Sequence, residues 1–219
     1  DLDPASVFSL AEEVLPKESG PAIPRDYGRE TDLTPLEAEV SCEMEVSMPT
    51  FLLGFKCPPM SGGQEQMRRT LIGELACDVL LGDSSPLYAR LYSQGLINGT
   101  FGYSFDTLPG VAYAYIGGDS KDPHAVAEEV LQEARRLVKD GIDPDYYARI
   151  VRANYGSTLK SLNSFESIAI SLVEGQFDGY DPLLFPEMFD SITPQDLLAF
   201  IRENLCREHM ALSVVYPKE

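Results

Sequence analysis

The side chains best suited to chemistry in this 219-residue sequence are its two histidines, His124 and His209. Glu128 follows His124 by one helical turn, so the two side chains could share a helix face and bind a cation. A first-turn histidine beside acidic residues is more often a solvated surface group, and His209 suits the edge of a fold. A zinc hydrolase needs three protein ligands, and a serine or cysteine nucleophile needs an adjacent imidazole base. We therefore predict no metal site and no catalytic residue in this chain.

Other motifs that could carry chemistry are also incomplete. The glycine-rich segments 61–63 and 117–119 lack the Lys-Ser/Thr pair of a phosphate-binding loop and the spacing of a dinucleotide fingerprint, so we interpret them as turns. The acidic clusters 143–145 and 178–181 do not follow the calcium-binding loop of an EF-hand. Residue chemistry alone favours a non-catalytic binding or scaffold domain.

The charge balance restricts the partners. Lys and Arg number 17 against 35 Asp and Glu, which gives a formal net charge of −18. Nucleic acid and anionic membrane surfaces are bound by clustered cations, so neither is an expected partner. The negative electrostatic field of the chain could attract basic peptides or basic protein surfaces. The simpler explanation of the high negative charge is solubility alone. The four cysteines, Cys42, Cys57, Cys77 and Cys206, form no CxxC motif, which predicts buried free thiols in a reducing, cytoplasmic location.

Strands and helices alternate in groups along the chain. Apolar–polar alternation predicts strands at 39–48, 51–56, 100–105, 111–116 and 211–216, the first of them with one solvated face. Helical periodicity and capping residues predict helices at 4–15, 64–81, 86–94, 123–140, 144–162, 165–174 and 194–205. This order predicts an α+β fold, with a largely antiparallel sheet and helices packed mainly on one face.

Three regions follow from this pattern. Residues 1–17 contain one amphipathic helix that cannot bury its apolar face alone, so we expect it to be the terminal helix of a missing preceding domain. Residues 18–35 are rich in Pro, Gly and charge and are predicted to be a linker. Residues 36–219 are the main, C-terminal domain. The chain begins without an initiator Met or a leader, so we expect an excised fragment.

The order of several weak motifs resembles the second half of an insulinase/pitrilysin-type (inverzincin) zinc peptidase. The motifs are 48–56, a long helix, 82–92, 95–97, 141–143 and 160–164, and the resemblance covers most of 36–216. It implies half of a metallopeptidase clamshell, in which two homologous α+β halves enclose a peptide. The family's zinc lies in the first half, on an H-x-x-E-H helix that this sequence lacks. Zinc is therefore expected in the parent protein and no cofactor in this chain.

The same resemblance indicates the candidate site residues. Many members place an Arg and a Tyr in the segment that corresponds to 91–101, where both reach the cleaved bond. Here Tyr92 falls near the Arg position and Asn98 near the Tyr position, so the usual pair is absent. Asn98 or Tyr103 could donate a hydrogen bond to an oxyanion, although turn or packing roles are simpler. Tyr92, Asn98 and Tyr103 are accordingly the candidate substrate-binding residues.

Three functions remain open from the sequence. The first is the substrate-enclosing, non-catalytic half of a zinc-dependent endopeptidase, with a peptide substrate and either an N-terminal peptidase half or a paralogous subunit as partner. The second is a non-enzymatic scaffold or the inactive partner of an active paralogue, suggested by the absent Arg/Tyr pair. The third is an unrelated binding domain in which a peptide adds to the sheet edge near 39–47.

Overall fold

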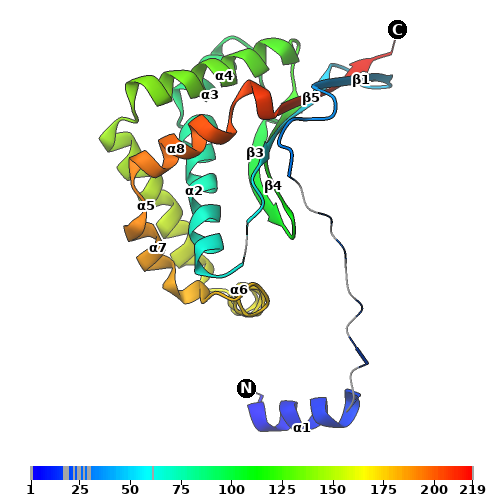
Figure 1. Cartoon of the computed structure of the whole chain (residues 1–219), viewed down its shortest axis with the longest axis vertical. Coiled ribbons are helices and arrows are strands. Elements are labelled where there is room, and N and C mark those ends of the chain that lie inside the picture. The colour runs from blue at the N-terminus through cyan, green and yellow to red at the C-terminus, as the bar shows by residue number, and fades with distance from the viewer. Residues whose placement is uncertain are drawn as a thin grey trace.

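One sheet organises the chain in the computed structural model, which describes residues 2–16, 20, 21, 23, 26, 28, 31–60 and 62–218 (Figure 1). Its five strands lie in the order β1-β5-β2-β4-β3. They are β1 (Glu39–Met44), β2 (Thr50–Cys57), β3 (Gly102–Leu108), β4 (Val111–Asp119) and β5 (Met210–Pro217). β1 pairs with β5 in parallel, and every other pair is antiparallel. The predicted α+β fold with a largely antiparallel sheet is confirmed.

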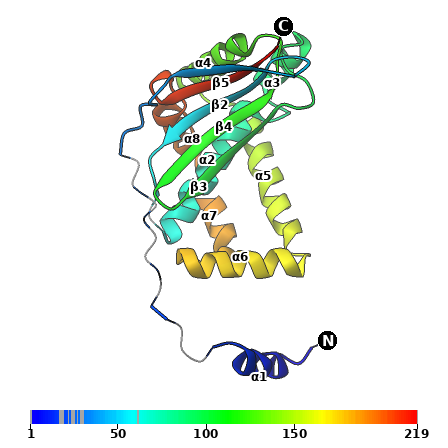
Figure 2. The ribbon, with the colours of Figure 1, turned by 90° about the vertical axis from the view of Figure 1, so that its right-hand side faces the viewer.

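The helices lie on one face of this sheet, as predicted (Figures 1 and 2). They are α2 (Gln64–Leu81), α3 (Pro86–Ser93), α4 (Pro123–Asp140), α5 (Pro144–Ser161), α6 (Phe165–Asp178), α7 (Phe185–Ser191) and α8 (Pro194–Asn204), with the short 3-10 turns η1 (Pro182–Leu184) and η2 (Arg207–His209). In β2, Phe51, Leu53 and Phe55 alternate with exposed or half-buried residues, which turns one strand face toward the helices. The core lies between that face and α2.

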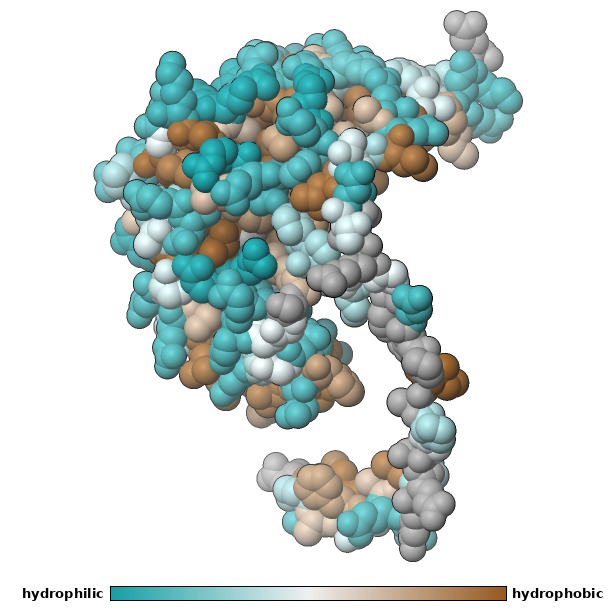
Figure 3. Space-filling view, viewed as in Figure 1, coloured by the Kyte–Doolittle hydropathy of each residue, from teal (hydrophilic) through white to brown (hydrophobic). Residues whose placement is uncertain are grey.

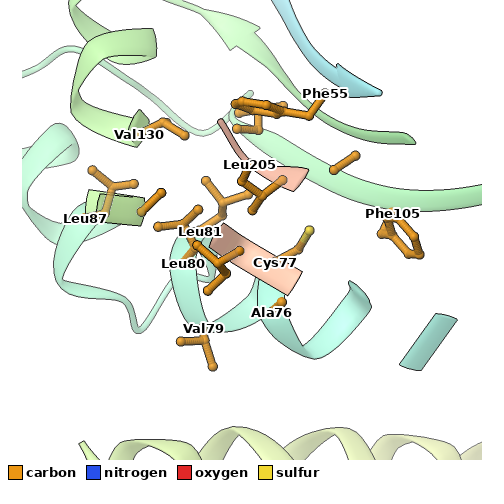
Figure 4. Close-up of a cluster of buried hydrophobic side chains, with 14 of the residues drawn as sticks. Phe55, Ala76, Cys77, Val79, Leu80, Leu81, Leu87, Phe105, Val130 and Leu205 are labelled. Carbon is orange, nitrogen blue, oxygen red and sulfur yellow. The ribbon is translucent and has the colours of Figure 1, made fainter. Parts of the chain in front are cut away.

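The core is built around the C-terminal half of α2. Figure 4 shows Leu80 and Leu81 of α2 among Phe55 of β2, Val130 of α4 and Leu205 after α8. Eight of the ten residues from Ile72 to Leu81 are buried, so this half of α2 is enclosed on most sides by the sheet and the neighbouring helices. This burial fixes α2 as the central helix of the fold.

Helix starts follow the capping residues seen in the sequence. Ser85, Asp122, Asp143 and Thr193 each precede a proline and accept a hydrogen bond from a backbone N–H of the first turn. The capping side chain accepts a hydrogen bond from a backbone N–H that has no acceptor within the helix. Proline at the first helical position has no N–H, so no acceptor is needed there. The predicted starts of α3, α4, α5 and α8 are therefore correct.

The prediction that only one face of the first strand is solvated is wrong, because both of its faces are exposed. Every residue of β1 is exposed, including Val40 at 45% and Met44 at 55%. β1 is the sheet edge beyond β5, and among the described residues no helix covers its apolar side. Val40, Cys42 and Met44 do alternate with polar residues along β1. Alternation indicates that the two faces of a strand differ in polarity, but it does not indicate whether another element covers the apolar face. Cys42 is consequently exposed and Cys206 half-buried, so of the four free thiols only Cys57 and Cys77 are buried as predicted.

The helix α7 was not expected. It has only two turns and contains Pro186, so neither length nor periodicity indicates a helix. Phe185 and Phe189 lie one turn apart, and their ring centroids lie 5.3 and 5.4 Å from that of Tyr155 on α5. Tertiary packing of these aromatic rings, rather than local propensity, stabilises α7.

The first helix, α1 (Pro4–Val14), lies apart from the sheet and its helices (Figures 1 and 2). None of its residues is buried, although Val7, Leu10 and Val14 are apolar. Its assignment to a preceding domain stays a prediction, and the linker predicted at 18–35 lies partly outside the described residues. Among the described helices, none combines the length and apolarity needed to cross a membrane.

Candidate functional site

An acidic groove opens between α2, β3, α5, α6 and α7. Its volume is about 400 Å³. Its lining consists of Gln66, Met67, Thr70, Leu71, Glu74, Thr107, Thr158, Glu174, Asp178, Tyr180, Phe185 and Phe189. Three carboxylates therefore face a hollow with aromatic walls, and no Lys or Arg belongs to the lining. We call this lining the acidic groove.

Close backbone contacts hold the ends of α2 and α6 together at one side of the groove. The N–H of Gly63, the residue before α2, donates to the carbonyl of Asp178 at 2.7 Å. A Cβ on Gly62 would lie 2.7 Å from the same carbonyl oxygen, so a larger residue there would separate the two segments. Glu74 and Asp178 are 104 positions apart, and this contact places their helices side by side.

Glu74 has the most perturbed carboxyl group of the groove. Desolvation by the surrounding protein, together with the nearby negative charges of Asp78 and Asp106, raises the pKa of Glu74 to about 7. The side chain itself still meets water within the groove. A carboxyl of this kind changes charge near neutral pH, so the negative charge of the groove depends on pH.

We expect Glu74→Gln to stabilise the protein above pH 7. The raised pKa means that protonated Glu74 contributes stability fully below the unfolded pKa of about 4.3, and that this contribution is lost as pH rises through about 7. Glutamine removes the unfavourable charge, so the midpoint of thermal unfolding should rise at pH 8 and stay unchanged at pH 4. Glu43→Gln, an exposed position on β1, is the control and should change neither value. A lower midpoint for Glu74→Gln at pH 8 would contradict the assignment.

Tyr103, one of the three candidate residues, is engaged inside the domain. Its hydroxyl donates to Asp78 Oδ1 at 2.8 Å, and Asn154 Nδ2 donates to Asp78 Oδ2 at 2.6 Å. Burial and the Asp78 carboxylate raise the pKa of Tyr103 well above its ordinary value, so this phenol remains protonated. These bonds join β3, α2 and α5. In this arrangement the hydroxyl of Tyr103 is used to hold α2 against β3.

Asn98 and Tyr92 lie before β3 and have other partners. Asn98 Oδ1 accepts from the backbone N–H of Thr100 at 2.8 Å and from its hydroxyl at 2.6 Å, which closes the turn into β3. Tyr92 is 56% exposed and stacks on Tyr88 with ring centroids 5.9 Å apart. Each of the three candidate residues has its own set of contacts, and their role in substrate binding stays a prediction.

The histidines do not assemble a metal site. Nε2 of His124 lies 3.4 Å from Glu39 Oε1, while Glu128 pairs with Arg207 instead of with His124. In the part of the chain that the structure describes, no group of three or more His, Cys, Asp or Glu side chains could hold a metal ion. These residues do not provide the set of donor atoms that zinc requires.

Sequence reasoning missed the acidic groove. Glu74, Thr158 and Glu174 come from three separate helices, and nothing in their local spacing relates them. Two signals were present in the sequence: the excess of 35 acidic over 17 basic residues, which indicates no position, and the acidic cluster 178–181, which contains Asp178 of the groove but does not indicate its partners.

Comparisons with known proteins give a consistent result. The family model described as the peptidase M16 inactive domain matches residues 1–154. YmfH, an uncharacterised zinc protease of Bacillus subtilis strain 168, is 30% identical over 228 residues, which cover 99% of this chain and 51% of YmfH. The chain thus spans about half the length of this curated relative.

Solved structures share the fold. An M16-like structure from Alicyclobacillus acidocaldarius superposes with a TM-score of 0.88 at 22% identity, covering 98% of this chain and 51% of that one. A peptidase M16 inactive domain from Pseudomonas fluorescens gives a TM-score of 0.74 at 16% identity, covering 100% of this chain and 52% of that one. At these identities the likeness concerns the fold alone.

Proposed function

The chain belongs to the peptidase M16 inactive-domain family, and from this premise we propose that it is the substrate-enclosing, non-catalytic half of a zinc-dependent endopeptidase. The zinc site belongs to a second M16 half, and the present chain supplies a wall of the chamber that encloses the peptide. The match to the inactive-domain model is the observation that carries the proposal.

Two structural features support this role. The described residues offer no donor set for zinc, so we derive no step of hydrolysis from them. The acidic groove provides carboxylates beside Phe185 and Phe189, an arrangement that suits the extended side chains of a peptide with Lys or Arg. The chain therefore holds and aligns a peptide, while bond cleavage takes place on its partner.

The lengths of the relatives support a paired arrangement. About half of the length of YmfH lies outside the match, as does about half of the Alicyclobacillus structure. A second M16 half, in the same polypeptide or in a paralogous subunit, completes the chamber in this proposal.

We expect the chain alone to show neither zinc-dependent cleavage nor stoichiometric zinc binding. The test incubates it with zinc and a library of internally quenched peptides rich in Lys and Arg, and measures bound metal after dialysis. The half of YmfH outside the match is then added as a separate protein, and cleavage above the level of that half alone is expected. Metal-dependent cleavage by the 219-residue chain itself would overturn the proposal.

A second function is favoured by one observation, the closed turn at Asn98. Its side-chain oxygen is occupied by Thr100, and Tyr92 stands near the position where the family often places an arginine. The chain would then be a scaffold or the inactive partner of an active paralogue, contributing no group to the cleaved bond. A one-to-one complex with the other half that leaves its cleavage rate unchanged would select this function.

A further inference from the structure

α6 carries an apolar surface that the rest of the domain leaves open. Phe165 is 92% exposed and Phe177 85% exposed, with Ala169 and Val173 exposed between them. These four residues follow one another at intervals of four, so they form one line about 18 Å long along the helix. We call them the α6 stripe. In Figure 3, tan and brown atoms lie at the lower end of the main domain, where Figure 1 places α6.

The helix that presents the stripe is well formed. Ser164 caps its start by accepting from the N–H of Ser167, and Gly179 ends it in the left-handed conformation at φ 78°. Of the fourteen residues of α6, all of them described, Gly175 alone is buried, and a Cβ there would lie 2.6 Å from the carbonyl oxygen of Tyr180. Figure 2 shows α6 lying across the ends of α5 and α7. The fold thus fixes one side of α6 and turns the apolar side outward.

An exposed line of large apolar residues is unfavourable in water and typically marks a contact surface. Its charges restrict the partner. α6 contains Glu166, Glu174 and Asp178 and no Lys or Arg. A second copy of this chain would bring these acids against each other, on molecules that each carry a net charge of −18. Anionic lipid is disfavoured for the same reason. The matching surface is apolar at its centre and carries Lys or Arg at its rim.

The length of this chain, compared with that of a related protein, indicates which kind of protein covers the α6 stripe. This chain covers 51% of YmfH, so a stretch of similar length lies outside the match, and in the proposed pairing that stretch is the half that contacts this one. α1 has no buried residue either and is joined to β1 through residues 15–38, a segment long enough to span about 80 Å when extended. One partner that covers both α1 and α6 removes both open apolar surfaces.

We infer that the α6 stripe is the surface on which the catalytic M16 half docks. The inference rests on the proposed pairing of two M16 halves and adds the place of contact. Glu174 and Asp178 lie on α6 and also line the acidic groove, so docking on α6 places the partner along the rim of that groove. The groove then opens into the space between the two halves, where a bound peptide would lie.

The test uses the Phe165→Ser/Phe177→Ser double variant. Both rings are exposed, so its thermal midpoint should equal that of the wild type, which verifies folding. Binding to the separately expressed half of YmfH outside the match is measured by isothermal titration calorimetry, and the dissociation constant should rise at least 100-fold. Leu108→Ser, an equally apolar exposed site on β3, is the matched control and should bind as the wild type does. Glu166→Lys should weaken binding about 10-fold at low salt and less at high salt.

The outcomes separate the inference from the proposed function. If the wild type does not bind the YmfH half, the pairing of halves is wrong and the inference falls with it. If the wild type binds and the double variant binds equally well, the pairing stands and the α6 surface is wrong. Analytical ultracentrifugation tests whether a second copy of the chain binds the stripe, and flotation with anionic vesicles tests whether lipid does. A wild-type dimer or vesicle binding that the double variant loses would assign the stripe to a second copy or to lipid, and would overturn the inference.

Discussion

Replacing Gly73 with valine is expected to lower the free energy of unfolding by about 3 kcal/mol. Gly73 lies in the middle of α2, where helix propensity alone would favour almost any other residue. A Cβ at this position would stand 2.4 Å from Cδ1 of Phe105 on β3. Phe105 cannot turn away easily, because its ring packs edge-on against Phe200 of α8 with centroids 5.2 Å apart. The substitution must therefore push α2 away from β3.

Gly156→Val is the matched control for this prediction. Gly156 lies inside α5, and an added Cβ would meet no atom within 4 Å. Without a steric penalty the change should be neutral within about 0.5 kcal/mol. Urea unfolding followed by circular dichroism measures both variants. Equal stability of the two would show that the approach of α2 to β3 is not limiting.

Glu133→Gln is expected to remove about 2 kcal/mol of stability at pH 7, since hydrogen bonds to charged groups are lost. The Glu133 side chain is 3% exposed, and it accepts from Arg90 Nη2 at 3.1 Å and from Arg136 Nε at 3.0 Å. Burial acts to raise the pKa of Glu133, but the two guanidinium groups outweigh it and hold the pKa below its ordinary value. The network links α3 to α4 behind the sheet.

The stability difference between wild type and Glu133→Gln is expected to depend on pH. Because the pKa of Glu133 is lowered by folding, its contribution is present above the unfolded pKa of about 4.3 and is lost as pH falls through the folded value. The difference between wild type and Glu133→Gln should therefore shrink in acid. Glu129→Gln is the control, because Glu129 binds the same Arg90 at 3.0 Å from a more exposed position and should cost below about 1 kcal/mol. Thermal melts at pH 7, 5 and 3 give the comparison, and a difference that grows toward low pH would contradict it.

Most of the fold was predictable because it is encoded locally. Proline after a capping residue marks four helix starts, and alternation along β2 and β4 marks which side chains enter the core. α7 was missed for the opposite reason, since it depends on contacts of Phe185 and Phe189 with a residue of another helix.

The candidate site was less predictable. Tyr92, Asn98 and Tyr103 follow from a family resemblance that gives their positions along the chain but not their partners. In the structure, the hydroxyl of Tyr103 donates a hydrogen bond to Asp78, 25 positions earlier in the chain. The side-chain oxygen of Asn98 accepts a hydrogen bond from Thr100 within its own turn. The acidic groove and the raised pKa of Glu74 depend on carboxylates brought together from different elements.

The sequence by itself determined the starts of α3, α4, α5 and α8 and which faces of its helices and strands are apolar. Only the tertiary structure decided which of those apolar faces are covered. α2 and α6 are both rich in apolar residues, yet α2 is enclosed by sheet and helices while α6 shows Phe165 and Phe177 to water. The physical reason is that periodicity records the preference of a face for burial, whereas burial itself requires a second surface, which distant parts of the chain or another molecule must provide.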